Sequence, residues 1–195
     1  MKTLTTLILL ALSASASIAQ SFYLPVPEKW TTEVFPIPIE FVPQITYTGE
    51  EHLRFAPGWG EPTSEELWTY CFLWWIKGDS KVSKQSLEKD IKAYYSGLVG
   101  RNIISRKIDS ALVVPTVASF NKSKAEKGDS ETYAGTVKML DYLSLKPITL
   151  NIIVHVMPCT KAGKLGVFFT ISPQPKTHAL WQKFNAVHEG FRCTQ

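Results

Sequence analysis

One stretch of ten residues, 67–76, restricts the possible folds of this chain more than any other feature. It is apolar or aromatic at nearly every position, and its even positions carry Trp68, Tyr70, Phe72 and Trp74. A β-strand that is hydrophobic on both faces has to be covered on both sides. We therefore expect 67–76 to be a central strand, with those four aromatic side chains buried on one face.

A second pattern predicts a β-hairpin near the carboxyl end. Residues 148–157 and 165–172 each place large apolar side chains on alternate positions, and a turn at 160–163 separates them. The two apolar sets share a face only if paired residue numbers sum to an odd value, which a four-residue turn gives.

The remaining segments complete an α+β domain. Strands are expected at 113–121 and 132–143, joined by a polar loop at 122–130, and a short hairpin around Gly49 is expected at 45–47 and 52–55. Helices are expected after Ser83, ended by Gly97 and Gly100, and at 178–189. Strands dominate, so we expect a mainly antiparallel sheet flanked by two or more helices in an α/β/α-like sandwich.

The chain begins with a signal for export. Residues 1–19 combine Lys2, a short apolar run and a small-x-small sequence ending at Ala19, which is typical of a cleaved signal peptide. The apolar run is too short to span a membrane. We expect a protein without a membrane span that is periplasmic or extracellular. Its single domain, 20–195, opens with an extended proline-rich segment, 20–43.

The charge of the chain argues against a nucleic-acid partner. The formal net charge of +4 falls to +3 without Lys2, and both basic clusters also contain acidic residues. A nucleic-acid site would need a denser basic stripe. We read the clusters as solvated surfaces.

Two short runs resemble those of uncharacterised secreted bacterial proteins. They are GEEHLRFAPGW at 49–59 and SPQP at 172–175. The order of the elements is also similar to that of the PsbP/Mog1-like α/β/α sandwich, whose members are mostly binding or accessory domains. The first resemblance covers most of the mature chain and implies no activity. The second concerns the fold alone and carries over no functional residue.

The three cysteines predict one disulfide bond. The expected strand at 165–172 runs about 25 Å away from the hairpin turn, at about 3.3 Å per residue. The expected helix at 178–189 returns about 18 Å at about 1.5 Å per residue, which brings Cys193 back to Cys159. We expect this pair to be bonded and Cys71 to be buried and free. The alternative is three unpaired cysteines, since export permits oxidation without compelling it.

The second face of the 148–172 hairpin carries candidate ligand-binding residues. Asn151, His155 and Phe168 lie on this face, which contains no charged residue. An uncharged sheet face is either covered by protein or lines a cavity with a few polar groups. The alternative is a covered face in which His155 is an ordinary hydrogen-bonded core residue.

Arg54 and Trp59 are further candidates, because glycines flank the tryptophan and let the backbone approach a ligand closely. An exposed indole there could stack on a sugar or an apolar group. The alternative is that Trp59 plugs one end of the sheet while Glu50, Glu51 and Arg54 form surface ion pairs.

Common catalytic motifs are absent, and the four histidines lack the spacing of a local zinc motif. We therefore predict no catalytic residue, no metal site and no cofactor. The expected function is an exported binding or accessory module for a small amphipathic molecule or an apolar segment of a partner protein. The alternatives are a small hydrolase that uses His155 and a structural envelope component with an aromatic assembly surface. A cleft in which His155 bonds a carboxylate would favour the hydrolase.

Overall fold

The fold is organised around one antiparallel sheet. The computed structural model describes residues 22–194, so the expected signal peptide and its cleavage site lie outside the described residues. Seven strands pair in the order β2-β3-β4-β8-β7-β6-β5, each antiparallel to its neighbours. Their bounds are β2 (Thr31–Ile37), β3 (Gly49–Phe55), β4 (Tyr70–Lys77), β5 (Val117–Ser123), β6 (Glu131–Asp141), β7 (Lys146–Cys159) and β8 (Lys164–Ser172). The predicted α+β class with a mainly antiparallel sheet is confirmed.

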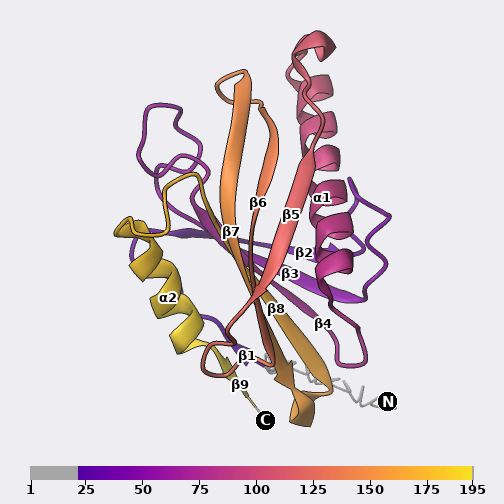
Figure 1. The fold of residues 1–195 in the computed structure, drawn as a ribbon, viewed down its shortest axis with the longest axis vertical. Helices are drawn as coiled ribbons and strands as arrows, with labels where there is room; N and C mark the ends of the chain where they lie inside the picture. The colour runs from indigo at the N-terminus through magenta and orange to yellow at the C-terminus, as the bar shows by residue number, and fades with distance from the viewer. Residues whose placement is uncertain (1–21, 195) are drawn as a thin grey trace, which may run out of the picture.

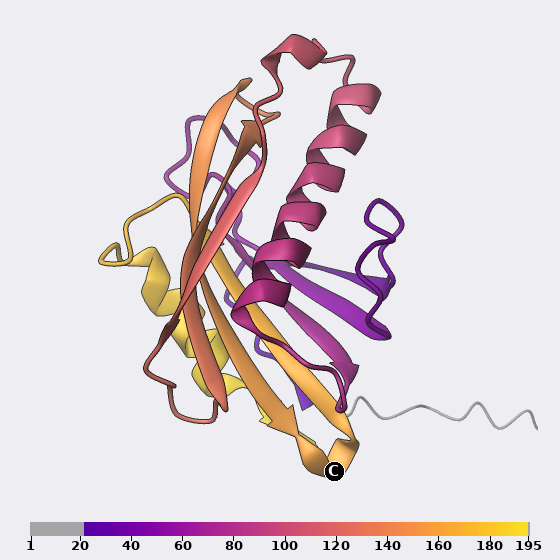
Figure 2. The same cartoon turned by 45° about the vertical axis from the view of Figure 1, so that its right-hand side comes forward.

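Two helices, α1 (Lys84–Ser105) and α2 (Leu180–Gly190), lie on opposite faces of this sheet (Figures 1 and 2). Buried side chains form a separate cluster beneath each helix. Alternate residues of β4 divide between them, with Phe72 in the cluster under α1 and Leu73 in the cluster under α2. We call the two sides of the sheet the α1 face and the α2 face. Among the described residues, no helix is both long and apolar enough to cross a membrane.

The strand predicted at 67–76 is β4, which lies between β3 and β8 and is buried on both faces. The four expected aromatic side chains are all buried in the α1-face cluster. The strand begins at Tyr70, three residues later than expected. Trp68 has a φ of +52°, in the left-handed region that no strand residue adopts.

The predicted carboxyl-terminal hairpin is confirmed in its register. β7 pairs with β8 so that Asn151 faces Ser172 and Val154 faces Phe169, pairs whose numbers sum to an odd value. A short 3₁₀ turn, η2 (Thr160–Ala162), and Gly163 connect the strands. The apolar set that includes Val154 therefore faces α1, and the set that includes His155 faces α2.

Helix α1 begins as predicted and ends later. The Ser83 side chain accepts a hydrogen bond from the Ser86 backbone N–H, which caps the helix. The prediction that Gly97 and Gly100 end the helix is wrong. A Cβ at Gly97 would come within 2.3 Å of the Phe41 carbonyl oxygen, so this glycine permits close packing against the 38–48 segment.

The two strands that follow α1 in sequence differ in their ends from those expected. β5 starts at Val117, after a 3₁₀ turn, η1 (Ser110–Leu112), and not at residue 113. β6 ends at Asp141, whose side chain accepts the backbone N–H of Leu143 and turns the chain toward β7.

The prediction of a hairpin around Gly49 is wrong. β3 begins at Gly49 and pairs with β2 on one side and with β4 on the other. The proline-rich segment supplies β2 as an edge strand that contains Pro36, a residue tolerated where a ladder donor can be missing. The short strands β1 (Phe22–Tyr23) and β9 (Arg192–Cys193) pair with each other.

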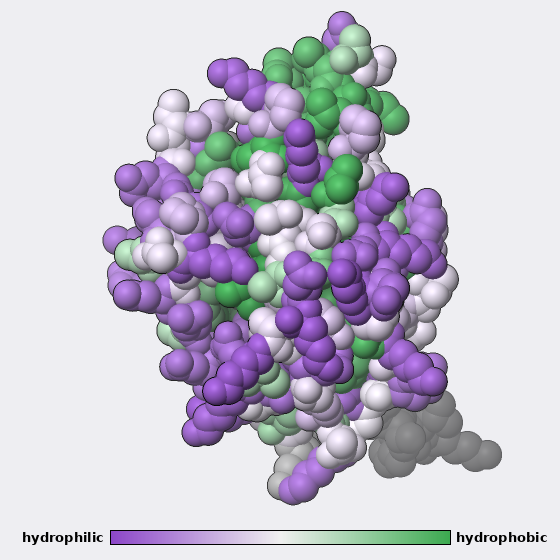
Figure 3. All heavy atoms as spheres, viewed as in Figure 1, coloured by the Kyte–Doolittle hydropathy of each residue, from purple (hydrophilic) through white to green (hydrophobic). Residues whose placement is uncertain are grey.

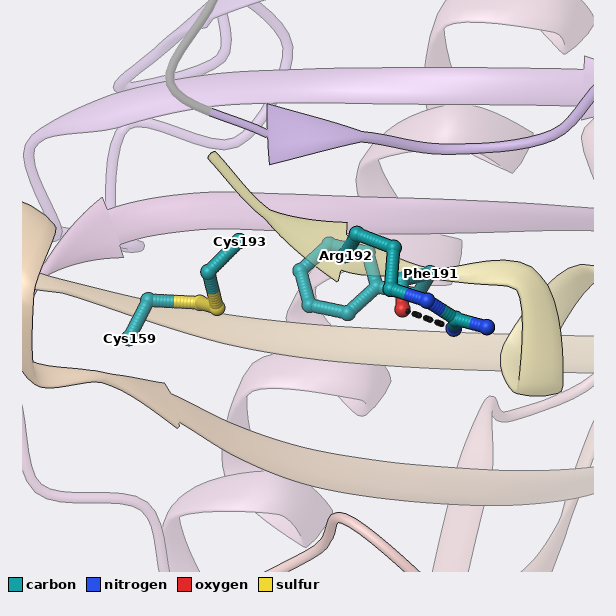
Figure 4. The surroundings of a disulfide bond; sticks show 4 residues. All are labelled: Cys159, Phe191, Arg192 and Cys193. Carbon is teal, nitrogen blue, oxygen red and sulfur yellow. Dashed lines mark hydrogen bonds between the residues drawn. A yellow bond between two sulfur atoms is a disulfide. The ribbon is translucent and has the colours of Figure 1, made fainter. Parts of the chain in front are cut away.

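The predicted disulfide is present. Cys159 at the end of β7 is bonded to Cys193 in β9, with 5.9 Å between their Cα atoms, and Cys71 is free and buried (Figure 4). The bond ties the segment after α2 to the end of the sheet. Beside it, the Arg192 guanidinium donates to the carbonyl oxygen of Phe191.

Replacing both cysteines of this bond with serine should lower the free energy of unfolding by about 2–4 kcal/mol, because the bond closes a loop of 34 residues and restricts the unfolded chain. Denaturant melts with and without a reductant check this. The reductant should bring the wild type down to the double variant and leave the double variant unchanged. A wild type that is insensitive to complete reduction would contradict the expectation.

Candidate functional site

The five predicted ligand-binding residues do not form one site. Arg54 is buried on the α2 face, where its guanidinium donates to the carbonyl oxygens of Leu53 and Leu24. Trp59 packs against the α1-face cluster. The sheet therefore separates these two residues, and the surface ion pairs considered for Arg54 and Glu51 do not form because both side chains are buried.

The three candidates of the β7–β8 hairpin lie on the α2 face as expected. Phe168 is fully buried under α2, and His155 is 3% exposed. The Asn151 side-chain amide donates to the carbonyl oxygens of Pro173 and Gln174, which fixes the turn after β8. Asn151 and Phe168 thus have structural partners within the protein.

A groove on the α1 face is the first candidate site, and we call it the aromatic groove. Its volume is about 570 Å³, within the range of small-molecule pockets. It lies between β2, β3 and β4 on one side and the second half of α1 on the other. Its lining residues are Glu33, Phe35, Phe41, Glu51, Leu53, Phe55, Trp59, Trp68, Tyr70, Tyr94, Leu98, Arg101, Asn102, Ser105, Arg106 and Tyr142.

The local sequence explains this arrangement. Leu98, Arg101 and Ser105 follow Tyr94 at intervals of three or four residues, so one stripe of α1 faces the groove. Cross-strand pairing places Glu51 beside Trp74 and Phe55 beside Tyr70 on the same sheet face.

Glu51 is the buried acidic group of the groove, and it is only 1% exposed. Trp74 Nε1 donates to its Oε1 over 3.0 Å, and the Tyr94 hydroxyl also hydrogen-bonds to it. Burial raises the pKa of Glu51 to about 7, an effect that these two hydrogen bonds oppose and that the nearby Glu33 adds to. A carboxyl group that titrates near neutrality inside a cavity is typical of functional sites.

The basic side chains of the groove lie at its solvent side. Arg101, near the end of α1, and Arg106, the residue that caps this end, are both exposed. Arg106 Nε donates to Asn102 Oδ1, and the guanidinium lies 5.2 Å from the centre of the Tyr142 ring. The groove therefore combines aromatic walls, a buried acid and exposed bases.

A second candidate site on the α2 face joins two histidines through one aspartate. His155 Nδ1 and His188 Nε2 each lie 2.8 Å from a different carboxylate oxygen of Asp129. The two imidazole rings stack with 3.8 Å between their centroids. Thr132 Oγ1 donates to Asp129 over 2.5 Å. We call these four residues the histidine–aspartate cluster.

The electrostatics of this cluster fix the positions of its protons. The Asp129 side chain is fully buried, which raises its pKa, but the hydrogen bonds from His155, His188 and Thr132 outweigh burial and lower the pKa to about 2. The carboxylate is ionised and accepts, so both histidines donate. The two nitrogens that face the carboxylate, His155 Nδ1 and His188 Nε2, therefore carry a hydrogen.

Glu126, His155 and His188 each offer a potential metal-ligand atom, and these atoms lie within 4.8 Å of one another. The stacked rings argue against joint coordination in this arrangement. Imidazole lone pairs lie in the ring plane, so the lone pairs of two facing rings run side by side and do not converge on one ion. A ring would have to rotate and give up its bond to Asp129.

A pocket of about 610 Å³ opens beside the cluster and includes His188 but not His155 among its lining residues. Lys127, Glu189 and Arg192 contribute charges to it, and Met157 and Phe191 contribute apolar surface. The chemistry available here is proton transfer by a histidine that an aspartate orients.

Hydrophobic surface also gathers at the end of the molecule where α1 finishes, seen at the top of Figure 3. Large exposed apolar residues in this part of the chain are Ile104, Leu112 and Val113. A patch of this kind is suited to contact with another surface.

Comparison of the chain with family models, curated proteins and solved structures gave no match. The resemblances to secreted bacterial proteins and to the PsbP/Mog1-like sandwich therefore stay predictions.

Proposed function

We propose that this chain is an exported binding module, periplasmic or extracellular, that holds a small amphipathic ligand in the aromatic groove. The observation that carries the proposal is the groove itself: a cavity of about 570 Å³ with aromatic walls and one deeply buried acid. Apolar walls with a few converging polar groups are the usual composition of a ligand site. The helix–sheet–helix layering, which we compare with an α/β/α-like sandwich, leaves the groove at one margin of the sheet.

The groove also shows a feature that a purely structural core lacks. Phe35 is 41% exposed on the edge strand β2, and it lines the same cavity as the fully buried Trp68. An aromatic surface thus continues from solvent into the interior. An apolar ligand body would cover this surface, and the gain is about 25 cal/mol per Å² of apolar area removed from water.

The mature protein should bind 2-naphthaleneethanol, a flat apolar probe with one hydroxyl group. Filling the groove by Leu98→Trp should weaken this binding at least about tenfold, because the new indole occupies the space of the probe. Isothermal titration calorimetry measures the affinity. Lys92→Trp, an exposed substitution on the same helix, is the matched control and should bind like the wild type. Equal affinities for the two variants would overturn the proposal.

A small hydrolase is the second candidate, and the histidine–aspartate cluster favours it. Asp129 orients His188, and His188 lines a pocket. A base held in this way activates water or a hydroxyl group. Turnover of an ester by the mature protein that disappears in His188→Gln, while Leu98→Trp keeps it, would select this function over binding in the groove.

A further inference from the structure

We infer that the ligand of the aromatic groove carries a protonated amine, which meets the carboxylate of Glu51. The inference rests on the proposed function and adds the chemical class of the ligand. A binding site recognises the group that complements its buried polar atoms, and the buried polar side chain of this groove is an acid.

Glu51 is a buried acid that has hydrogen-bond donors around it but no cation. Its partners are the indole N–H of Trp74 and the hydroxyl of Tyr94. Among the described residues, no ion pair within 4.0 Å involves Glu51. A buried carboxylate without a counter-ion is costly, and a bound ammonium group would supply the missing charge.

The aromatic walls suit a cation as well. The faces of tryptophan, tyrosine and phenylalanine rings carry negative potential and attract ammonium groups. Phe55 stacks on Tyr70, with 5.5 Å between ring centroids, and packs at a tilt against Trp59, with 4.7 Å between centroids, so several aromatic rings are grouped on one side of the groove. Such a group of rings also excludes water from the charge that it surrounds.

The other charged groups of the groove are compatible with this inference. Glu33 on β2 lines the groove and adds negative potential at Glu51. Arg101 on α1 and Arg106 directly after it are exposed to solvent, which screens their repulsion of an ammonium group. Tyr70 on β4 and Tyr94 and Tyr95 on α1 stay neutral, because burial raises the pKa of each.

The inference predicts a pH dependence with a definite sign. The pKa of Glu51 is raised to about 7, so its carboxylate is about one-tenth ionised at pH 6 and about nine-tenths ionised at pH 8. An alkyl amine is protonated at both pH values. Because the amine binds the ionised form, its affinity should rise about tenfold from pH 6 to pH 8.

Three matched probes test this: 2-(2-naphthyl)ethylamine, 2-naphthaleneethanol and 2-naphthaleneacetate, the anion of the carboxylic acid. Calorimetry at pH 8 should show the amine binding about tenfold or more tightly than the alcohol, and the acetate binding least. In Glu51→Gln the preference for the amine and its pH dependence should both disappear, while the alcohol still binds. Glu50→Gln is the control, because Glu50 is the exposed neighbour on the other face of β3 and should change neither.

The outcomes separate the two proposals. An amine that binds no more tightly than the alcohol, or an acetate that binds best, overturns the inference and leaves binding in the groove standing. Binding of none of the three probes overturns the proposed function and the inference with it. A preference for the amine that survives in Glu51→Gln also contradicts the inference, because another group would then hold the ammonium.

Discussion

Truncation of Phe72 to alanine should lower the free energy of unfolding by about 3–5 kcal/mol. Phe72 is fully buried in β4, and its ring stacks on Phe169 from β8 at 4.5 Å and on Tyr94 from α1 at 5.4 Å. The substitution removes the side chain that joins the centre of the sheet to the long helix. The cavity cannot close without moving both elements.

Urea melts of the wild type and the variant measure this loss. Phe35→Ala is the matched control, since it makes the same truncation at a position that is 41% exposed on the edge strand. It should cost well under half as much. A loss near 1 kcal/mol or less for Phe72→Ala would mean that this part of the core is loosely packed.

Replacement of Asp129 by alanine should cost a similar amount, about 3–5 kcal/mol. Its carboxylate accepts hydrogen bonds from His155, His188 and Thr132, and all three donors lose their acceptor in the variant. Each buried donor left without a partner costs about 1–3 kcal/mol. The effect is structural: the carboxylate holds α2 and β7 to the loop before β6.

The pH dependence of this effect has a definite sign. The pKa of Asp129 is lowered in the folded protein from its usual 3.8 to about 2. The stabilisation is therefore complete above pH 4 and is lost as the pH falls toward 2. Melts at pH 7 and pH 2.5 should show a smaller difference between wild type and Asp129→Ala at the lower pH. The exposed Asp79→Ala is the control, and a loss of similar size there would argue against this account.

Much of the fold could be predicted from the sequence because its central segments are hydrophobic in regular patterns. The β7–β8 hairpin and α2 each show a hydrophobic period that matches their structure, and β4 is apolar on both faces, as a central strand requires. The disulfide followed from chain lengths alone, because a strand of 165–172 and a helix of 178–189 bring Cys193 back to Cys159. Gly97 misled the prediction because a glycine can mark either a helix end or a close contact, and only the position of Phe41 distinguishes them.

Neither candidate site could be recognised from sequence patterns, since each assembles residues that are far apart in the chain. Strand alternation predicts that Glu51 and Glu50 lie on opposite faces of their strand. It does not predict that Glu51 is buried, because that depends on β2 and α1 covering it. His155 and His188 are 33 positions apart. A signal was present: they precede the bonded Cys159 and Cys193 by four and five residues, so the predicted disulfide already implied that they lie near each other.

The central claim is that ligands bind in the aromatic groove, and the six tryptophan side chains test it most directly. Trp59 and Trp68 line the groove and Trp74 donates to Glu51, whereas Trp30, Trp75 and Trp181 belong to the cluster on the α2 face. Each indole N–H gives its own signal in a ¹⁵N-correlated NMR spectrum. Titration with 2-(2-naphthyl)ethylamine at pH 8 should shift the signals of the first three and leave the other three in place. Shifts confined to Trp30, Trp75 and Trp181 would place the ligand on the α2 face and contradict the account.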